Sequence, residues 1–251
     1  MLTTELVTYL DQTLQSNQIR DFCPNGLQVQ GKPNIQSIVA GVTASQALVD
    51  EAIARNADAV LVHHGYFWKN EPAAVVGMKY NRLKALLTHD INLIAYHLPL
   101  DVHAEHGNNA QLAKRLGIVD AEGLDPNDPF SVAMQGRLAQ PVTGAQLAER
   151  IAQSLNRTPV FVEGHGGVVQ KVGWCTGGGQ SYIDQAVAAG CDAFITGEAS
   201  EQTVHVAREM GIDFIAAGHH ATERYGALAL GRHIAEKFDL NVEFVDIDNP
   251  V

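Results

Sequence analysis

A strand–helix–strand pattern occurs twice in this chain, and the second copy aligns with the first without a gap. Residues 169–199 lie over residues 35–65, and a further apolar strand follows each copy, at 91–97 and at 212–219. Strands that alternate with helices favour a mainly parallel sheet covered by helices. The sequence therefore predicts an α/β fold of two pseudo-equivalent, internally duplicated lobes with mainly parallel sheets.

The boundary between the lobes is expected where turn-forming residues are densest, at 123–129 (GLDPNDP). We therefore expect an N-terminal lobe over 1–125 and a C-terminal lobe over 126–251. One alternative stays open for the last strand, 241–247, which could return to the first lobe.

Two neighbouring histidines end a strand of the first copy. The apolar run of residues 59–62 leads directly into His63, His64 and Gly65. The carboxyl ends of strands in an open α/β sheet are where ligands bind, and two imidazoles there could bind metal. The other interpretation is one buried, hydrogen-bonded histidine beside a solvated one.

Two further histidines are each followed by a carboxylate four residues later, His97 by Asp101 and His219 by Glu223. In a helical turn these positions share a face. The two pairs follow matching strands of the duplicated unit, which favours the ligand interpretation.

A metal site between the lobes follows from these positions. We expect five side chains to meet in one cleft between the lobes and to act as metal ligands: His63, His64, Asp101, His219 and Glu223. Imidazoles mixed with carboxylates suit Zn, Fe, Mn, Co or Ni better than Ca or Mg. Five ligands are too many for one tetrahedral ion, so we expect two divalent ions per chain. Two adjacent ions point to metal-assisted hydrolysis.

Composition excludes several other classes. A net charge of −11 argues against nucleic-acid binding, which depends on lysine and arginine. No apolar run approaches the roughly 20 residues that span a bilayer, and the N-terminus lacks the pattern of a secretory signal. The three scattered cysteines are odd in number and are expected to be reduced thiols. We expect a cytoplasmic protein that does not contact membranes.

Three weaker features each leave two interpretations open. The glycines 177–179 could hold a phosphate between a strand and a helix, or could form a plain tight turn. The aromatic residues 66–68 could wall a pocket of the size of a nucleobase, or could pack within their loop. Glu198, which aligns with His64, could be a base near the metal or a surface residue.

Five motifs together resemble the GTP cyclohydrolase 1 type 2 homolog family across the whole chain: PNGLQV (24–29), VHHG (62–65), HLPLD (97–101), GNNA (107–110) and GHHATE (218–223). The resemblance implies a two-lobed α/β fold with a dinuclear metal centre. It also implies a toroidal homohexamer, built as a trimer of dimers. The five ligand positions match the family one by one, and His97 matches a further histidine of the site.

The expected function is a dinuclear metal-dependent hydrolase of a nucleotide-like small molecule. The candidate reaction is GTP cyclohydrolase-type ring opening, in which a metal-bound hydroxide attacks C8 and His97 or Glu198 moves protons. The alternative is a non-catalytic protein that binds or handles metal. A ring that threads nucleic acid is a third hypothesis, which the acidic charge opposes.

Overall fold

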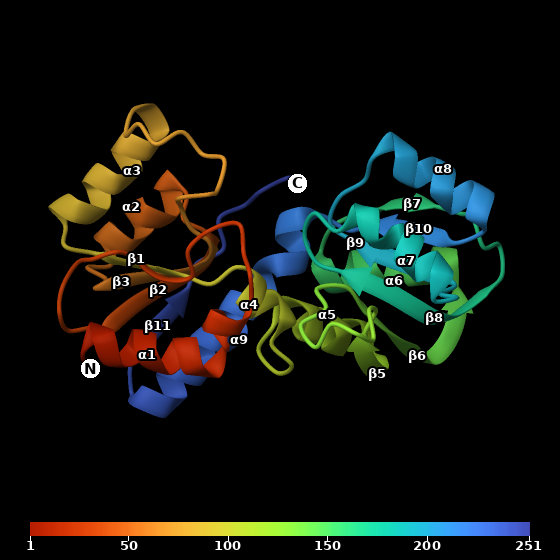
Figure 1. The fold of residues 1–251 in the computed structure, drawn as a ribbon, viewed down its shortest axis with the longest axis horizontal. Helices are drawn as coiled ribbons and strands as arrows, with labels where there is room; N and C mark the ends of the chain where they lie inside the picture. The colour runs from red at the N-terminus through yellow and green to blue at the C-terminus, as the bar shows by residue number, and fades with distance from the viewer. The chain divides into compact units, whose positions relative to one another are not determined.

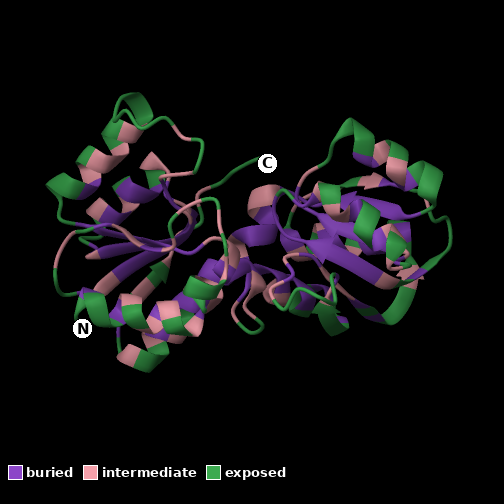
Figure 2. Cartoon of the chain, in the orientation of Figure 1, coloured by how far each residue is buried: buried purple, intermediate pink, exposed green.

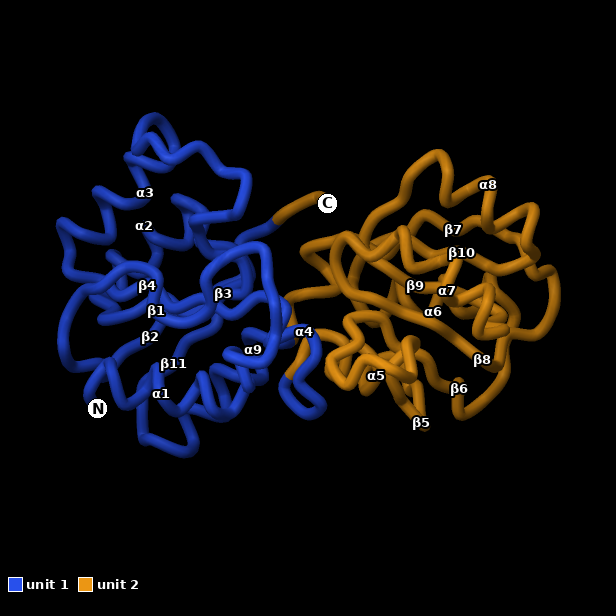
Figure 3. Tube along the Cα trace, in the orientation of Figure 1, with its two compact units in different colours: residues 1–106, 226–248 blue, residues 107–225, 249–251 orange.

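A computed structural model describes residues 1–251. The chain forms two compact units, coloured separately in Figure 3. Unit 1 comprises residues 1–106 and 226–248, and unit 2 comprises residues 107–225 and 249–251. Each unit has its own sheet, so each is described by itself.

The sheet of unit 1 has five strands, and its four consecutive strands from β4 to β11 are parallel. Only β1 at the edge pairs antiparallel, with β4. In spatial order the strands are β1 (Gly26–Val29), β4 (Asn92–Ala95), β3 (Ala59–His64), β2 (Ser37–Thr43) and β11 (Asn241–Phe244).

Helices cover both faces of this sheet (Figure 1). They are α1 (Thr3–Thr13), the 3-10 helix η1 (Ser16–Gln18), α2 (Gln46–Ala54), α3 (Gly77–Thr88), α4 (Leu98–Val102) and residues 226–238 of α9 (His219–Phe238). Successive strand residues point to opposite faces. Ile38 therefore packs with α1 and α9, whereas Val39 packs with α2 and α3.

The sheet of unit 2 has six strands, of which the three central ones are parallel. In spatial order they are β5 (Ile118–Gly123), β6 (Met134–Thr143), β8 (Val168–Cys175), β9 (Ala193–Thr196), β10 (Asp213–Ala216) and β7 (Val160–Val162). The three pairs toward the edges are antiparallel, and only β5 and β6 are consecutive in the chain. Parallel pairing in this unit is thus confined to the repeated strands.

Helices also cover both faces of the second sheet, and its central strands β8, β9 and β10 are largely buried (Figure 2). They are α5 (Asn108–Leu116), α6 (Gly144–Leu155), the 3-10 helix η2 (Gln180–Tyr182), α7 (Ile183–Ala188), α8 (Glu201–Met210) and residues 219–225 of α9. One core contains Leu147 and Ile151 of α6, and the other contains Ile183 of α7 and Ala207 of α8. Each unit is therefore a layered α/β structure.

Strand registers confirm the internal duplication. Ile38 pairs with Ala59 in unit 1, and the aligned residues Val172 and Ala193 pair in unit 2. The next pair, Ala59 with Asn92, has its counterpart in Ala193 with Asp213. The repeated segments therefore share backbone pairing as well as sequence.

The boundary expected at 125/126 lies inside unit 2, and the first break falls at 106/107 instead. The turn-forming segment after Gly123 connects β5 to β6, whose Met134 pairs with that glycine. A dense run of turn formers marks a tight connection here. The last strand, β11, belongs to unit 1, where Asn241 pairs with Ser37 of β2.

None of the helices combines the length and the apolar character that crossing a membrane requires.

Candidate metal centre

The end of β3 places two imidazoles side by side in unit 1. The ring centroids of His63 and His64 are 4.4 Å apart, and His63 is fully buried. His97, at the start of α4, brings a third imidazole 5.1 Å from His63 and 5.7 Å from His64. One nitrogen from each ring lies within 4.8 Å of the others, so the three form a group that could hold a metal ion.

A carboxylate completes this group from the next turn of the chain. Pro99 lies in the first turn of α4, where its fixed φ suits a helix start, and Asp101 follows His97 by one turn. The Asp101 Oδ1 atom is 3.5 Å from His63 Nε2, and the Asp101 side chain is buried. Three imidazoles and a carboxylate are the ligand types that first-row divalent ions accept.

Each imidazole of this group has its Nδ1 atom at hydrogen-bond distance from a protein oxygen. The partner of His63 is the Tyr96 carbonyl at 3.1 Å, that of His64 is the Thr43 hydroxyl at 3.1 Å, and that of His97 is an Asp21 carboxylate oxygen at 2.7 Å. A carbonyl and a carboxylate only accept, so Nδ1 donates and Nε2 keeps its lone pair. Outer partners of this kind set the tautomer of histidines that bind metal.

Residues 21–28 support this group, although the sequence indicates 24–29 only as a motif of the family resemblance and gives no role to Asp21. Asp21 accepts from the Leu98 backbone N–H at 2.9 Å as well as from His97, and Asn25 Oδ1 accepts from the His97 N–H at 2.7 Å. The Gln28 side chain accepts from the Tyr66 N–H at 2.7 Å, just beyond β3. The motif at 24–29 therefore braces the chain on both sides of the histidines.

The charge state of Asp21 suits this role. Burial alone would raise the pKa of Asp21, but the hydrogen bond and charge attraction of His97, with the donors Asn25 and Phe22, lower it below its ordinary value. The neighbouring Cys23 behaves differently, because burial and the Asp21 charge raise its pKa to about 12. Without a bound metal ion, this thiol is therefore protonated at neutral pH, whereas Asp21 carries a charge.

The remaining predicted residues form a second group, in unit 2. His219 and Glu223 are one turn apart in α9, and His219 Nε2 is 3.1 Å from Glu223 Oε2. Glu198 Oε1 lies 2.6 Å from Nδ1 of His219. Glu198 is therefore the outer partner of this histidine, as Asp21 is of His97.

Two carboxylates make this position favourable for a cation. Burial would lower the pKa of His219, but hydrogen bonds and charges from Glu223 and Glu198 raise it to about 9. The Glu223 side chain is buried. A metal ion bound to His219 would replace this proton and would interact with the same two carboxylates.

The glycine-rich loop at 177–179 lies against this group and is a tight turn. The Gly177 N–H donates to the Thr222 hydroxyl at 3.0 Å, and the Gly179 N–H donates to the Thr196 hydroxyl at 3.1 Å. Gly177 has φ +65°, and a Cβ there would lie 2.0 Å from Glu223 Oε1. Glycine therefore allows the loop to approach Glu223, and these two N–H groups are not directed at a phosphate.

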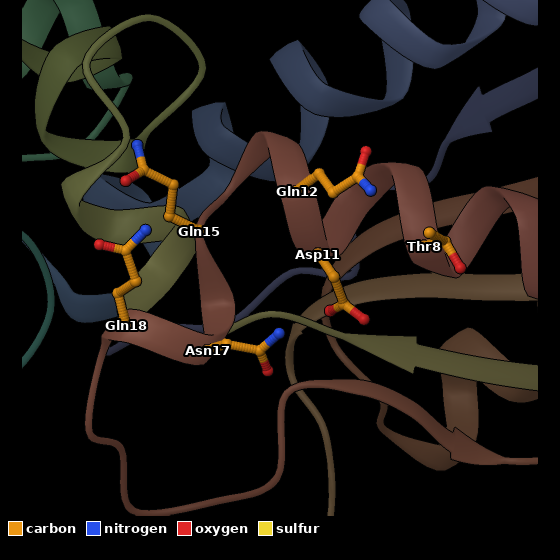
Figure 4. A pocket seen from close by; sticks show the side chains of 6 residues that line it. All are labelled: Thr8, Asp11, Gln12, Gln15, Asn17 and Gln18. Atoms are coloured by element: carbon orange, nitrogen blue, oxygen red, sulfur yellow. The ribbon is translucent and has the colours of Figure 1, made fainter.

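A surface hollow of about 410 Å³ lies elsewhere in unit 1, along α1 and η1 (Figure 4). Its lining is polar: Thr8, Asp11, Gln12, Gln15, Asn17 and Gln18. It contains none of the residues predicted for the metal site.

The fold and these two groups define a class of protein: an α/β chain with two sheets whose buried histidines and carboxylates could hold a metal ion. The chain belongs to the Duf34/NIF3 (NGG1p interacting factor 3) family, whose model matches residues 1–250.

Curated relatives and solved structures agree with this assignment. Relatives from Pseudomonas aeruginosa and from Escherichia coli K12, each named GTP cyclohydrolase 1 type 2 homolog, are both 56% identical to the chain. The first alignment covers 98% of this chain and 97% of the relative, and the second covers all of both. The structure of protein ybgI, described as of unknown function, is 55% identical over the full length of both chains, with a TM-score of 0.96. TTHA1606 from Thermus thermophilus is 36% identical over the full length of both chains, with a TM-score of 0.90.

Proposed function

We propose that this protein is a metal-dependent hydrolase of a nucleotide-like small molecule, and that GTP ring opening is the reaction to test first. The names of the curated relatives supply the candidate substrate. The observation that carries the proposal is the anchoring of the histidines. In both groups the Nδ1 atom of each histidine lies at hydrogen-bond distance from a protein oxygen. Nε2 is therefore the atom through which each histidine would bind a metal ion.

The proposed ligands of two divalent ions are His63, His64, Asp101, His219 and Glu223. Their chemistry suits Zn, Fe, Mn, Co or Ni, and availability decides among these ions. Bound divalent ions would supply Lewis-acid chemistry for hydrolysis.

His97 is the proposed proton-transfer residue. Its Nδ1 is held by Asp21 at 2.7 Å, so its Nε2 can accept or return a proton while the ring keeps its orientation. This pairing resembles the way a buried aspartate orients a catalytic histidine in hydrolases. Glu198 is better placed to orient His219 through Nδ1 than to transfer a proton to substrate.

Metal content tests the ligand set. Purified wild-type protein, reconstituted separately with Zn²⁺, Mn²⁺ and Co²⁺, is expected to retain two ions per chain after desalting. His63→Ala and Glu223→Ala should each retain fewer, whereas His89→Ala, at an exposed position, should match the wild type. Wild-type protein with less than one ion per chain, or ligand variants with unchanged content, would contradict the proposed site.

Turnover tests the reaction. In GTP ring opening, water adds at C8 and the imidazole ring opens to a formamidopyrimidine, which chromatography with mass detection identifies. Product is expected from metal-loaded wild type and His89→Ala, and should be lost in Glu223→Ala and strongly reduced in His97→Ala.

A non-catalytic role in metal handling is the second candidate, and the glycine-rich loop supports it. Two N–H groups that could have held a phosphate are taken up by Thr222 and Thr196. Full metal content without product from any nucleotide would favour this role.

A further inference from the structure

We infer that Trp68 is the surface on which a planar heterocycle of the substrate stacks, an inference that rests on the proposed function. Trp68 follows the end of β3 by four residues, and its half-buried ring lies against two imidazoles of the candidate site. The ring centroid of Trp68 is 4.9 Å from that of His97 and 6.0 Å from that of His64.

The orientation of these rings leaves the indole suited to another partner. Trp68 meets His97 at an interplanar angle of 82°, and it is tilted by 53° from His64. Neither imidazole therefore stacks in parallel on the indole. Because the indole borders both imidazoles, a substrate bound at these histidines would lie within reach of it.

The backbone before Trp68 is held in an unusual conformation. Phe67 has φ +65°, a region that residues other than glycine, and bulky ones above all, rarely adopt. One carboxylate oxygen of Glu71 accepts both from the Phe67 N–H at 2.8 Å and from the Trp68 N–H at 3.2 Å. Such strain persists where the surroundings enforce it, and it concentrates at functional sites.

The other two aromatic residues of the loop have different roles. Tyr66 is buried, and its hydroxyl donates to the Ala44 carbonyl at 2.8 Å. Phe67 packs against the core of unit 1, with Lys79 Nζ 5.3 Å from its ring centroid. The Lys69 N–H, beyond Trp68, donates to the Phe22 carbonyl at 2.7 Å. Anchors on both sides therefore fix the loop and leave Trp68 facing the histidines.

The chemistry of an indole at this position identifies the ligand class. Every nucleobase has a π-face, and stacking of a base on an aromatic side chain contributes about 1–3 kcal/mol. The triphosphate of a nucleotide gains nothing from such a surface. A base-bearing ligand and a base-free one should therefore respond differently to changes at Trp68.

Binding of GTP and of inorganic triphosphate to metal-loaded protein separates the two effects. Trp68→Ala should weaken GTP binding by about 5- to 150-fold, which corresponds to 1–3 kcal/mol, and leave triphosphate binding unchanged. Trp68→Phe should restore most of the GTP affinity. Both variants should keep the wild-type metal content and thermal midpoint. Equal effects of Trp68→Ala on both probes, or none on GTP, would overturn the inference.

Tryptophan emission gives an independent readout. The chain has two tryptophans, and Trp174 is fully buried in unit 2, so the difference between wild type and Trp68→Phe isolates the emission of Trp68. GTP should quench this emission at saturating concentration, and triphosphate should not. If the wild type retains metal but GTP leaves the emission unchanged, this inference fails while the metal site stands. If it retains no metal, the proposed function fails first.

Discussion

Asp58 and Asp192 receive the same backbone hydrogen bonds in two different sheets. Asp58 Oδ2 accepts from the N–H groups of Gln36 at 2.9 Å and Ser37 at 3.0 Å. Asp192 Oδ2 accepts from the aligned residues Gln170 and Lys171 at 2.9 and 2.8 Å. In each unit this carboxylate directly precedes one central strand and accepts from the backbone in the N-terminal part of the neighbouring strand. The duplication therefore preserved a fold-defining contact while the opposite strand ends diverged into different site residues.

Removing either carboxylate should destabilise the fold. Asp58→Ala and Asp192→Ala each leave two backbone N–H groups without their acceptor, and each should lower the free energy of unfolding by about 1–3 kcal/mol. Asp50→Ala, at an exposed helical position, should change it by less than about 0.5 kcal/mol. Urea unfolding followed by circular dichroism measures all three. A loss in only one of the two variants would contradict the equivalence of the two contacts.

The contribution of Asp58 should depend on pH. Burial alone would raise its pKa, but the hydrogen bond from Lys32 and those from the Gln36 and Ser37 N–H groups lower it in the folded state. A carboxyl whose folded pKa lies below its unfolded value stabilises the protein above the unfolded pKa. That stabilisation is lost as the pH falls through the folded pKa.

Asp58→Asn isolates this charge, because the amide oxygen can still accept from the backbone. The stability difference between wild type and Asp58→Asn should be constant from about pH 7 to 5 and shrink below about pH 4, near the ordinary pKa of an aspartate. Urea midpoints at pH 7, 5, 4 and 3 give this difference. A difference that grows as the pH falls would contradict the sign of the pKa shift.

Gly177 and Gly190 provide a matched pair for testing how the glycine-rich loop supports Glu223. Both have positive φ, +65° and +71°, so alanine is strained at either position. A Cβ at Gly190 would meet nothing within 4 Å, whereas one at Gly177 would lie 2.0 Å from Glu223 Oε1.

Gly190→Ala should therefore cost about 1–2 kcal/mol and leave metal content unchanged. Gly177→Ala should lower the free energy of unfolding further and reduce metal content, because Glu223 must move. Urea unfolding and metal analysis on both variants test this. If both variants lose the same free energy of unfolding and keep the same metal content, the close approach of Gly177 to Glu223 affects neither stability nor metal binding.

Periodic and repeated features of the fold could be predicted from the sequence. The apolar residues Leu6, Leu10 and Leu14 recur at helical spacing, and all three are buried in the core of unit 1. The duplication predicted the three repeated parallel strands of each sheet, β2, β3 and β4 in unit 1 and β8, β9 and β10 in unit 2, because local pattern determines them. The antiparallel edges of unit 2 and the return of β11 to unit 1 depend on long-range pairing, which a local pattern does not encode.

The same distinction applies to the candidate site. Histidines at strand ends and carboxylates one turn later are visible as short spacings, so His97 and Asp101 could be recognised as a pair. The partner of His97 could not, because Asp21 lies 76 residues earlier in the chain. Its position beside a Pro-Asn-Gly turn indicates only a loop. The one signal near it in the sequence is the motif at 24–29, which carries part of the family resemblance.

Asp21 should control the tautomer of His97, because both oxygens of its carboxylate accept hydrogen bonds. Oδ1 accepts from the Phe22 N–H and from His97, and Oδ2 accepts from the Asn25 side chain and the Leu98 N–H. In Asp21→Asn, whichever way the amide turns, its NH₂ group faces two donors. The variant should lose about 1–3 kcal/mol of stability.

The tautomer itself can be read by ¹⁵N NMR of histidine-labelled protein. Wild-type His97 should carry its proton on Nδ1, and Asp21→Ala should shift the ring toward a mixture of tautomers because the acceptor is gone. His64, whose Nδ1 faces Thr43, serves as the internal control and should keep its wild-type signals. His97→Ala identifies the resonances. If His97 keeps its Nδ1 proton fully in Asp21→Ala, the Asp21 carboxylate does not set the tautomer.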